Sequence, residues 1–184
     1  MTRVLTILFA LLPVFPAAIL AQDIYEATGV STEFFSSAPI EDIAAQAEDG
    51  YSLWNTRNGE ISFRINIRSF EFEKGKMQEH FNENFMESHK YPHATFKGRL
   101  LEQPDLEQEG EYQVRLAGIL QIHGVEQNRE VNARLRVKGD VVELLSNFEV
   151  KIADHEIEIP KLLFRNIAEV VSVEVRADYS KLEL

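Results

Sequence analysis

The chain has 184 residues, of which 45% are hydrophobic and 27% charged, a composition typical of one soluble globular domain. It contains no cysteine, which excludes disulfide frameworks, cysteine-based zinc sites, thiol nucleophiles and a lipid anchor on an N-terminal cysteine. Thirty acidic against nineteen basic residues give a net charge of −11. Most of the surface would therefore repel a phosphate backbone, and nucleic-acid binding is not expected.

The N-terminal residues 1–21 have the pattern of a signal peptide. One cation, Arg3, is followed by an apolar run without acidic residues. A membrane anchor is the alternative, because residues 4–21 just reach spanning length, but two prolines and the alanines at the end favour cleavage near Ala21. We therefore expect one domain over residues 22–184, periplasmic or secreted, with no stable membrane insertion after cleavage.

Period-two alternation of apolar and polar residues dominates the rest of the sequence and predicts strands with one buried face. The turn signal Lys138-Gly139-Asp140 joins two of these stretches as a hairpin. Weaker candidates near residues 23–35, 51–56 and 93–103 bring the expected number to about eight strands. The clearest alternating sets are Ile61, Phe63, Ile65 and Ile67; Val114, Leu116, Leu120 and Ile122; Val131, Ala133, Leu135 and Val137; Val142, Leu144, Phe148, Val150 and Ile152; and Val171, Val173, Val175, Ala177 and Tyr179.

One segment, residues 76–89, has the period of an amphipathic helix instead. Met77, Phe81 and Phe85 recur every four positions with polar residues between them. The helix is expected to end before Pro92, because proline cannot continue the hydrogen-bond ladder.

Two further breaks in the strand pattern bear on the architecture. The phase shift after Ile67 predicts a bulge near Ser69. A second short helix or turn is expected over residues 39–48, where Ile40, Ile43, Ala44 and Ala47 share a stripe. Many antiparallel strands with two helical interruptions predict an all-β sandwich or closed barrel, and closure removes exposed edge strands.

The sequence carries no motif of a hydrolase elbow, zinc protease, phosphate loop or dinucleotide site. No catalytic residue and no cofactor are therefore predicted, and the protein is not expected to be an enzyme. His80, His89 and His93 could join in a metal site, although solvated histidines near a helix end are the simpler interpretation. His123, before a glycine turn, is expected to bond a nearby carbonyl or carboxylate.

An eight-stranded barrel with this much inward apolar surface has room either for interlocking side chains or for one small ligand. Alternation by itself does not separate a dry, packed core from a binding cavity, and close packing is the usual state of a protein interior.

Three blocks of the sequence resemble the YceI-like family of exported bacterial proteins. The longest is Met77-Gln-Glu-His-Phe-Asn-Glu-Asn-Phe-Met-Glu-Ser-His-Lys-Tyr-Pro-His-Ala-Thr-Phe-Lys-Gly98, similar to the family's central motif. The others are Gly118-Ile-Leu-Gln-Ile-His-Gly-Val125, and Phe148-Glu-Val-Lys-Ile-Ala-Asp154 followed by Ile157-Glu-Ile-Pro160. The blocks occur in the family's order over most of the chain.

This resemblance implies an eight-stranded, antiparallel, lipocalin-like barrel with a helix over one side. It also implies an elongated apolar pocket, which in characterised relatives holds a polyisoprenoid chain. Tyr51, Trp54, Tyr91 and His123 are candidate polar groups at its mouth. The expected ligand-binding residues, from the inward phase and the helix stripe, are Phe63, Ile65, Met77, Phe81, Phe85, Leu116, Leu120, Leu135, Leu144 and Phe148.

The leading hypothesis is thus a non-enzymatic barrel that holds an isoprenoid lipid, or another long-chain apolar small molecule, for carriage, storage or protection. Two alternatives stay open: a ligand-free stress-response or interaction barrel, and a metal-dependent hydrolase using His80, His89 and His93. The sequence leaves open whether the protein is a monomer or a homodimer.

Overall fold

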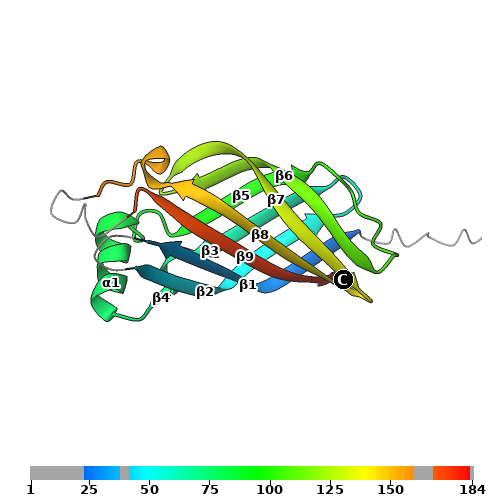
Figure 1. The fold of residues 1–184 in the computed structure, drawn as a ribbon, viewed down its shortest axis with the longest axis horizontal. Helices are drawn as coiled ribbons and strands as arrows, with labels where there is room; N and C mark the ends of the chain where they lie inside the picture. Colours follow the sequence, from blue (N-terminus) through cyan, green and yellow to red (C-terminus); the bar gives the residue numbers. More distant parts are fainter. Residues whose placement is uncertain (1–22, 38–41, 160–167, 183–184) are drawn as a thin grey trace, which may run out of the picture.

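The computed structural model describes residues 23–37, 42–159 and 168–182. Within these ranges the chain forms nine antiparallel strands in one sheet, ordered β1-β9-β8-β7-β6-β5-β3-β2-β4. Because β1 also pairs with β2, eight strands close into a barrel, and the two-residue strand β4 lies outside the circle on β2. The predicted all-β barrel is confirmed (Figure 1). The strands are β1 (Ile24–Ser36), β2 (Ile43–Asn55), β3 (Glu60–Asn66), β4 (Glu71–Phe72), β5 (His93–Leu100), β6 (Gly110–Ile122), β7 (Val125–Lys138), β8 (Val141–Lys151) and β9 (Val170–Lys181).

Two tight hairpins join β6 to β7 and β7 to β8. Ile122 pairs directly with Val125, and the two residues between them, His123 and Gly124, have φ angles of 53° and 77°. Positive φ at both central positions is the requirement of a type I′ turn, whose twist matches that of the strands. The second hairpin turns at Gly139, with φ of 54°, as the sequence predicted.

The predicted amphipathic helix is present but shorter than residues 76–89. It comprises α1 (Gly75–His80), which continues into a π-helical turn η2 (Phe81–Phe85), and Figure 1 shows α1 at one end of the barrel. The ladder stops because the backbone of Glu87 takes a left-handed conformation (φ 41°) and the Ser88 N–H bonds to the Asn82 carbonyl at 2.8 Å. No helix in the described residues is long and apolar enough to cross a membrane.

Two local predictions are wrong. Near Ser69 the chain makes a 3-10 turn, η1 (Ile67–Ser69), in place of a bulge, and the Asn66 side chain accepts a hydrogen bond from the Arg68 N–H there. The second predicted helix, over residues 39–48, is largely strand: β2 begins at Ile43, and 39–41 lie outside the described residues. Alanine favours helices locally, but pairing with β1 on one side and β4 on the other outweighs that preference.

One end of the barrel is filled with side chains. Trp54 and Tyr179 are 2% and 0% exposed and their rings meet edge to face at 5.8 Å. The Ser52 hydroxyl bonds the Tyr179 hydroxyl and the Ser62 carbonyl, and burial raises the pKa of Tyr179 far above its ordinary value. At this end the expected close-packed core is present.

Candidate ligand-binding site

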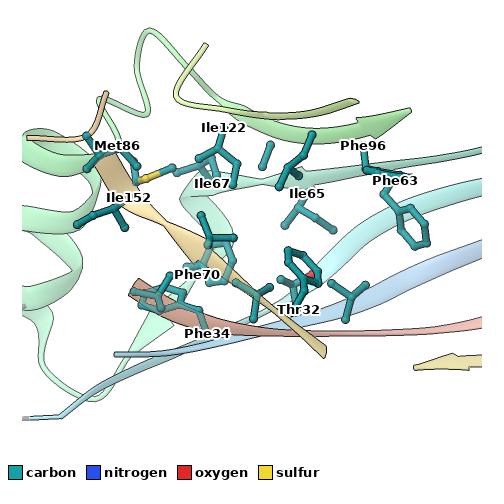
Figure 2. A pocket seen from close by; sticks show the side chains of 18 of the residues that line it. Thr32, Phe34, Phe63, Ile65, Ile67, Phe70, Met86, Phe96, Ile122 and Ile152 are labelled. Carbon is teal, nitrogen blue, oxygen red and sulfur yellow. The ribbon is translucent and has the colours of Figure 1, made fainter. Parts of the chain in front are cut away.

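The other half of the barrel, beneath α1 and η2, encloses a cavity of about 320 Å³, a volume within the range of small-molecule sites. Its wall consists of the inward-facing residues of the strands and the inner face of the helical segment (Figure 2). Nearly all of that wall is aliphatic or aromatic. It includes Phe34, Phe63, Ile65, Ile67, Phe70, Met77, Phe81, Phe85, Met86, Leu116, Leu120, Ile122, Val131, Leu144, Phe148, Val150, Ile152, Val171, Val173 and Val175.

Nine of the ten residues expected to contact a ligand line this cavity, and Leu135 is the exception. Leu135 faces inward as predicted but is 0% exposed; it pairs with Tyr112 on β6 and with the cavity-lining Leu144 on β8, so it lies where the packed end meets the cavity. Alternation along a strand shows which face a residue takes, whereas its depth along the barrel axis depends on the strand's tilt and register. On β7 the cavity wall is formed instead by Val131 and Arg129. A ligand role for the other nine stays a prediction.

Several cavity-lining residues were not predicted from the sequence. Register shifts between β1 and β2 interrupt the alternation of inward- and outward-facing residues there. Ala27 and Val30 both face inward, although they are three residues apart, because Gly29 (φ 69°) is an extra residue opposite β2. From Val30 onward the even-numbered residues of β1 face the interior, among them Thr32 and Phe34. Only the glycine itself signals such a bulge in the sequence.

An aromatic cluster, Phe34, Phe70, Phe72 and Phe81, attaches one side of the helical segment to the barrel. The ring of Phe81 stacks on that of Phe34 with 5.5 Å between centroids and lies 4.9 Å from that of Phe72. Phe70 contacts both Phe34 and Phe81, at 5.4 and 5.6 Å. These rings form part of the cavity wall, so the helix position and the cavity shape are coupled.

A polar cluster around His123 fixes the other end of the helical segment. His123 Nε2 lies 2.9 Å from Glu87 Oε2 and Nδ1 lies 3.2 Å from the His155 carbonyl oxygen, which confirms the expected carbonyl and carboxylate partners. The Tyr91 ring meets the imidazole edge to face at 4.5 Å. His155, in the 3-10 turn η3 (Ile152–His155), is buried and bonds the Val125 carbonyl through Nδ1 at 3.2 Å.

None of the four predicted mouth groups, Tyr51, Trp54, Tyr91 and His123, is among the residues that line the cavity. Trp54 lies in the packed end, and Tyr51 donates a hydrogen bond to Glu26 Oε2 at 3.3 Å.

Few polar atoms face the cavity, and most of them are satisfied by the protein. Ser146 donates to the Asn132 carbonyl at 2.8 Å, Arg129 donates to the Glu149 carbonyl, and Ser36 accepts from the Ala168 N–H at 3.1 Å. The hydroxyl of Thr32 differs, because it is buried without a hydrogen-bond partner among the described residues.

The three histidines considered as metal ligands do not form such a site here. Within residues 23–37, 42–159 and 168–182, no three His, Asp or Glu side chains are grouped as metal ligands. His80 lies at the rim of the cavity, while His89 borders a separate surface hollow with Arg68 and Ser88. The metal-dependent hydrolase hypothesis therefore gains no support from the geometry.

A closed antiparallel barrel that is packed at one end and hollow and apolar at the other belongs to the lipocalin-like class of ligand-binding architectures. A family model described as YceI-like domain matches residues 28–179. The chain belongs to the YceI-like family.

Solved structures with the same fold include three bacterial proteins. A polyisoprenoid binding domain from Saccharophagus degradans implicated in plant cell wall breakdown has 18% identity, covers 88% of this chain and 99% of its own, and gives a TM-score of 0.73. BcnA from Burkholderia cenocepacia has 13% identity, 81% and 95% coverage and a TM-score of 0.69. The YceI protein of Campylobacter jejuni has 15% identity, 80% and 90% coverage and a TM-score of 0.62. No protein of curated function matches the sequence significantly.

Proposed function

We propose that this protein is exported and holds a polyisoprenoid, or a similarly long apolar chain, inside the barrel without chemically changing it. The observation that carries the proposal is the contrast between the two halves of one barrel, one filled by side chains and the other enclosing about 320 Å³ lined by apolar residues. The polyisoprenoid-binding domain of S. degradans, which shares the fold, supports an isoprenoid as the occupant.

Apolar burial is the driving force that such a wall offers. At about 25 cal/mol per Å², covering about 400 Å² of an isoprenoid chain contributes about 10 kcal/mol before the entropic costs of association. This attraction is non-directional, so selectivity for chain length comes from the depth of the cavity and the closure of α1 and η2 over it.

Native mass spectrometry of the protein purified from its own cells tests the binding. We expect an adduct that is lost on denaturation and is recovered in an organic extract as an isoprenoid lipid. Ala94→Phe, which fills space in the cavity wall, should reduce the adduct, whereas Ala44→Phe, an exposed site on β2, should retain it. A clean unliganded mass that persists after exposure to isoprenoid lipids would exclude the proposed function.

Export rests on the signal-peptide pattern of residues 1–21 and has its own test. N-terminal sequencing of the protein from fractionated cells should give Gln22 as the first residue of the periplasmic or secreted form. A full-length chain in the cytoplasmic fraction alone would contradict export.

A further inference from the structure

Among the residues that the structure describes, one polar side-chain atom of the cavity wall is buried without a hydrogen-bond partner. Thr32 is 6% exposed, and its Oγ1 makes no hydrogen bond within the described part of the chain. Burying a hydroxyl without a partner is unfavourable, and such groups are rare in folded proteins. Two other buried hydroxyls line the cavity, and both have partners: Ser146 donates to the Asn132 carbonyl, and Ser36 accepts from the Ala168 N–H.

Thr32 lies at the inner end of the β1 wall. It is the innermost cavity-lining residue of β1, because the next inward-facing residue, Val30, is 0% exposed and does not line the cavity. Its register partner on β9 is Val175, which also marks the inner end of the cavity on that strand. Figure 2 shows Thr32 well inside the cavity, away from Met86 and Ile152.

The fold directs this hydroxyl inward by a specific device. The extra residue Gly29 shifts the phase of β1, so that Thr32 faces the interior while Ser31 and Glu33 take the other face. Without the shift, the odd-numbered residues would face inward and the charged Glu33 would be among them. Bulges of this kind commonly re-aim a side chain next to a functional site.

We propose that the Thr32 hydroxyl donates a hydrogen bond to an oxygen at the leading end of the bound chain. This inference rests on the proposed function and narrows it: the ligand is a long apolar chain with a neutral, hydrogen-bond-accepting oxygen, such as a ketone carbonyl, at the end that enters first. The oxygen is uncharged, because a single neutral donor in an apolar wall cannot replace the hydration of a carboxylate or phosphate. The Arg129 side chain is already directed to the Glu149 carbonyl.

A double-mutant cycle between protein and ligand measures this bond. Farnesylacetone and the hydrocarbon in which its carbonyl is replaced by a methylene compete with a bound fluorescent apolar probe, in the wild type and in Thr32→Val. The hydrocarbon is intrinsically the more hydrophobic, so the quantity of interest is the ketone-to-hydrocarbon affinity ratio. We expect Thr32→Val to lower that ratio about fivefold, the usual effect of one neutral hydrogen bond.

Two controls identify the hydroxyl as the cause. Thr32→Ser keeps a donor at the position and should preserve most of the ratio. Ser146→Ala should leave the ratio unchanged, because the Ser146 proton is already used by the Asn132 carbonyl. Equal ratios in wild type and Thr32→Val, with both compounds bound, would overturn the inference and leave the proposed function standing. Failure of both compounds to bind the wild type would overturn the proposed function as well.

The unliganded protein gives a second, independent readout. Thr32→Val has nearly the same shape and removes an unsatisfied hydroxyl, so the unliganded variant should unfold at a higher temperature than the wild type. A lower unfolding temperature would show that the protein itself satisfies the hydroxyl and would contradict the inference.

Discussion

His123 Nε2 lies 2.9 Å from Glu87 Oε2, and both residues have left-handed backbone conformations, with φ of 53° and 41°. The contact joins the chain just after the π-helical turn to the β6–β7 hairpin, two segments that are 36 residues apart. Met86 and Ile122, the neighbours of this pair in sequence, both line the cavity. The contact therefore holds the end of the helical segment against the hairpin beside the cavity wall.

Replacing His123 by alanine should destabilise the fold by about 1–3 kcal/mol, because the change leaves Glu87 and the His155 carbonyl without their partner. Urea unfolding followed by tryptophan fluorescence measures the loss. His89→Ala, at an exposed position near the same helix end, is the matched control and should change stability by less than about 0.5 kcal/mol. Equal effects of the two substitutions would show that the His123 contacts contribute nothing.

Because of His155, the free energy of unfolding should decrease as the pH is lowered through the pKa of an unfolded histidine. Burial lowers the pKa of His155, and Arg129 lowers it further, against the opposing effects of the Val125 carbonyl and Asp154. In the unfolded chain histidine titrates near about 6.5, so between that value and the lower folded-state pKa the unfolded state binds more protons. The stabilising contribution of neutral, buried His155 to the folded state is fully present above about pH 7.5, and it decreases as the pH falls through about 6.5.

Measuring the free energy of unfolding from pH 8 to pH 5.5, in about half-unit steps, tests this dependence. His155→Asn, whose amide can replace Nδ1 as a donor to the Val125 carbonyl, should show a shallower slope than the wild type over this range. Identical slopes would mean that another group is responsible.

The boundary between packed core and cavity predicts different costs for two substitutions on neighbouring strands. Leu135→Ala opens a void in the packed end and should cost about 3–5 kcal/mol, whereas Phe148→Ala enlarges a space that already exists and should cost less in the unliganded protein. Ligand affinity should follow the opposite order, with the larger loss for Phe148→Ala. Chemical denaturation without lipid measures the loss of unfolding free energy, and the added stability with lipid bound measures affinity. If Leu135→Ala and Phe148→Ala lose equal stability and equal affinity, the interior is a continuous, filled core.

A glycine pair between β5 and β6 has no room for a side chain. A Cβ on Gly98 would lie 2.4 Å from the Ala117 carbonyl oxygen, 2.8 Å from the Phe96 ring and 2.9 Å from the Gly118 Cα. Two of these three atoms are backbone, so Gly98→Ala should force the strands apart and cost more than about 2 kcal/mol. Gly75→Ala is the control, because a Cβ there has nothing within 4 Å, and it should leave stability unchanged or slightly raised. Thermal unfolding compares the two variants. An unchanged unfolding temperature for Gly98→Ala would refute the steric argument.

Much of the architecture follows from the sequence because period-two alternation is a local property of a half-buried strand. The inward faces of β3 and β6 to β9 were predictable from residues such as Ile65, Leu116 and Val173, and the helical stripe Met77, Phe81 and Phe85 was predictable from its period. His123 was predicted to bond an oxygen, but nothing in the sequence indicated that the oxygen belongs to Glu87.

Strand pairing, depth along the barrel axis and the phase shift in β1 were set by the tertiary structure, because alternation in the sequence does not encode them. Ala44 and Ala45 are in a strand because they pair with β1 and β4. Leu135 is fully buried beside the cavity because strand register sets how deep a residue lies along the barrel axis. The extra residue Gly29 directs the Thr32 side chain into the cavity. The sequence by itself determined the barrel class, the family resemblance and the apolar character of the interior. Where the interior stays hollow, and which hydroxyl faces that space, depended on pairing between strands far apart in the chain, since face is a local property whereas depth and register are not.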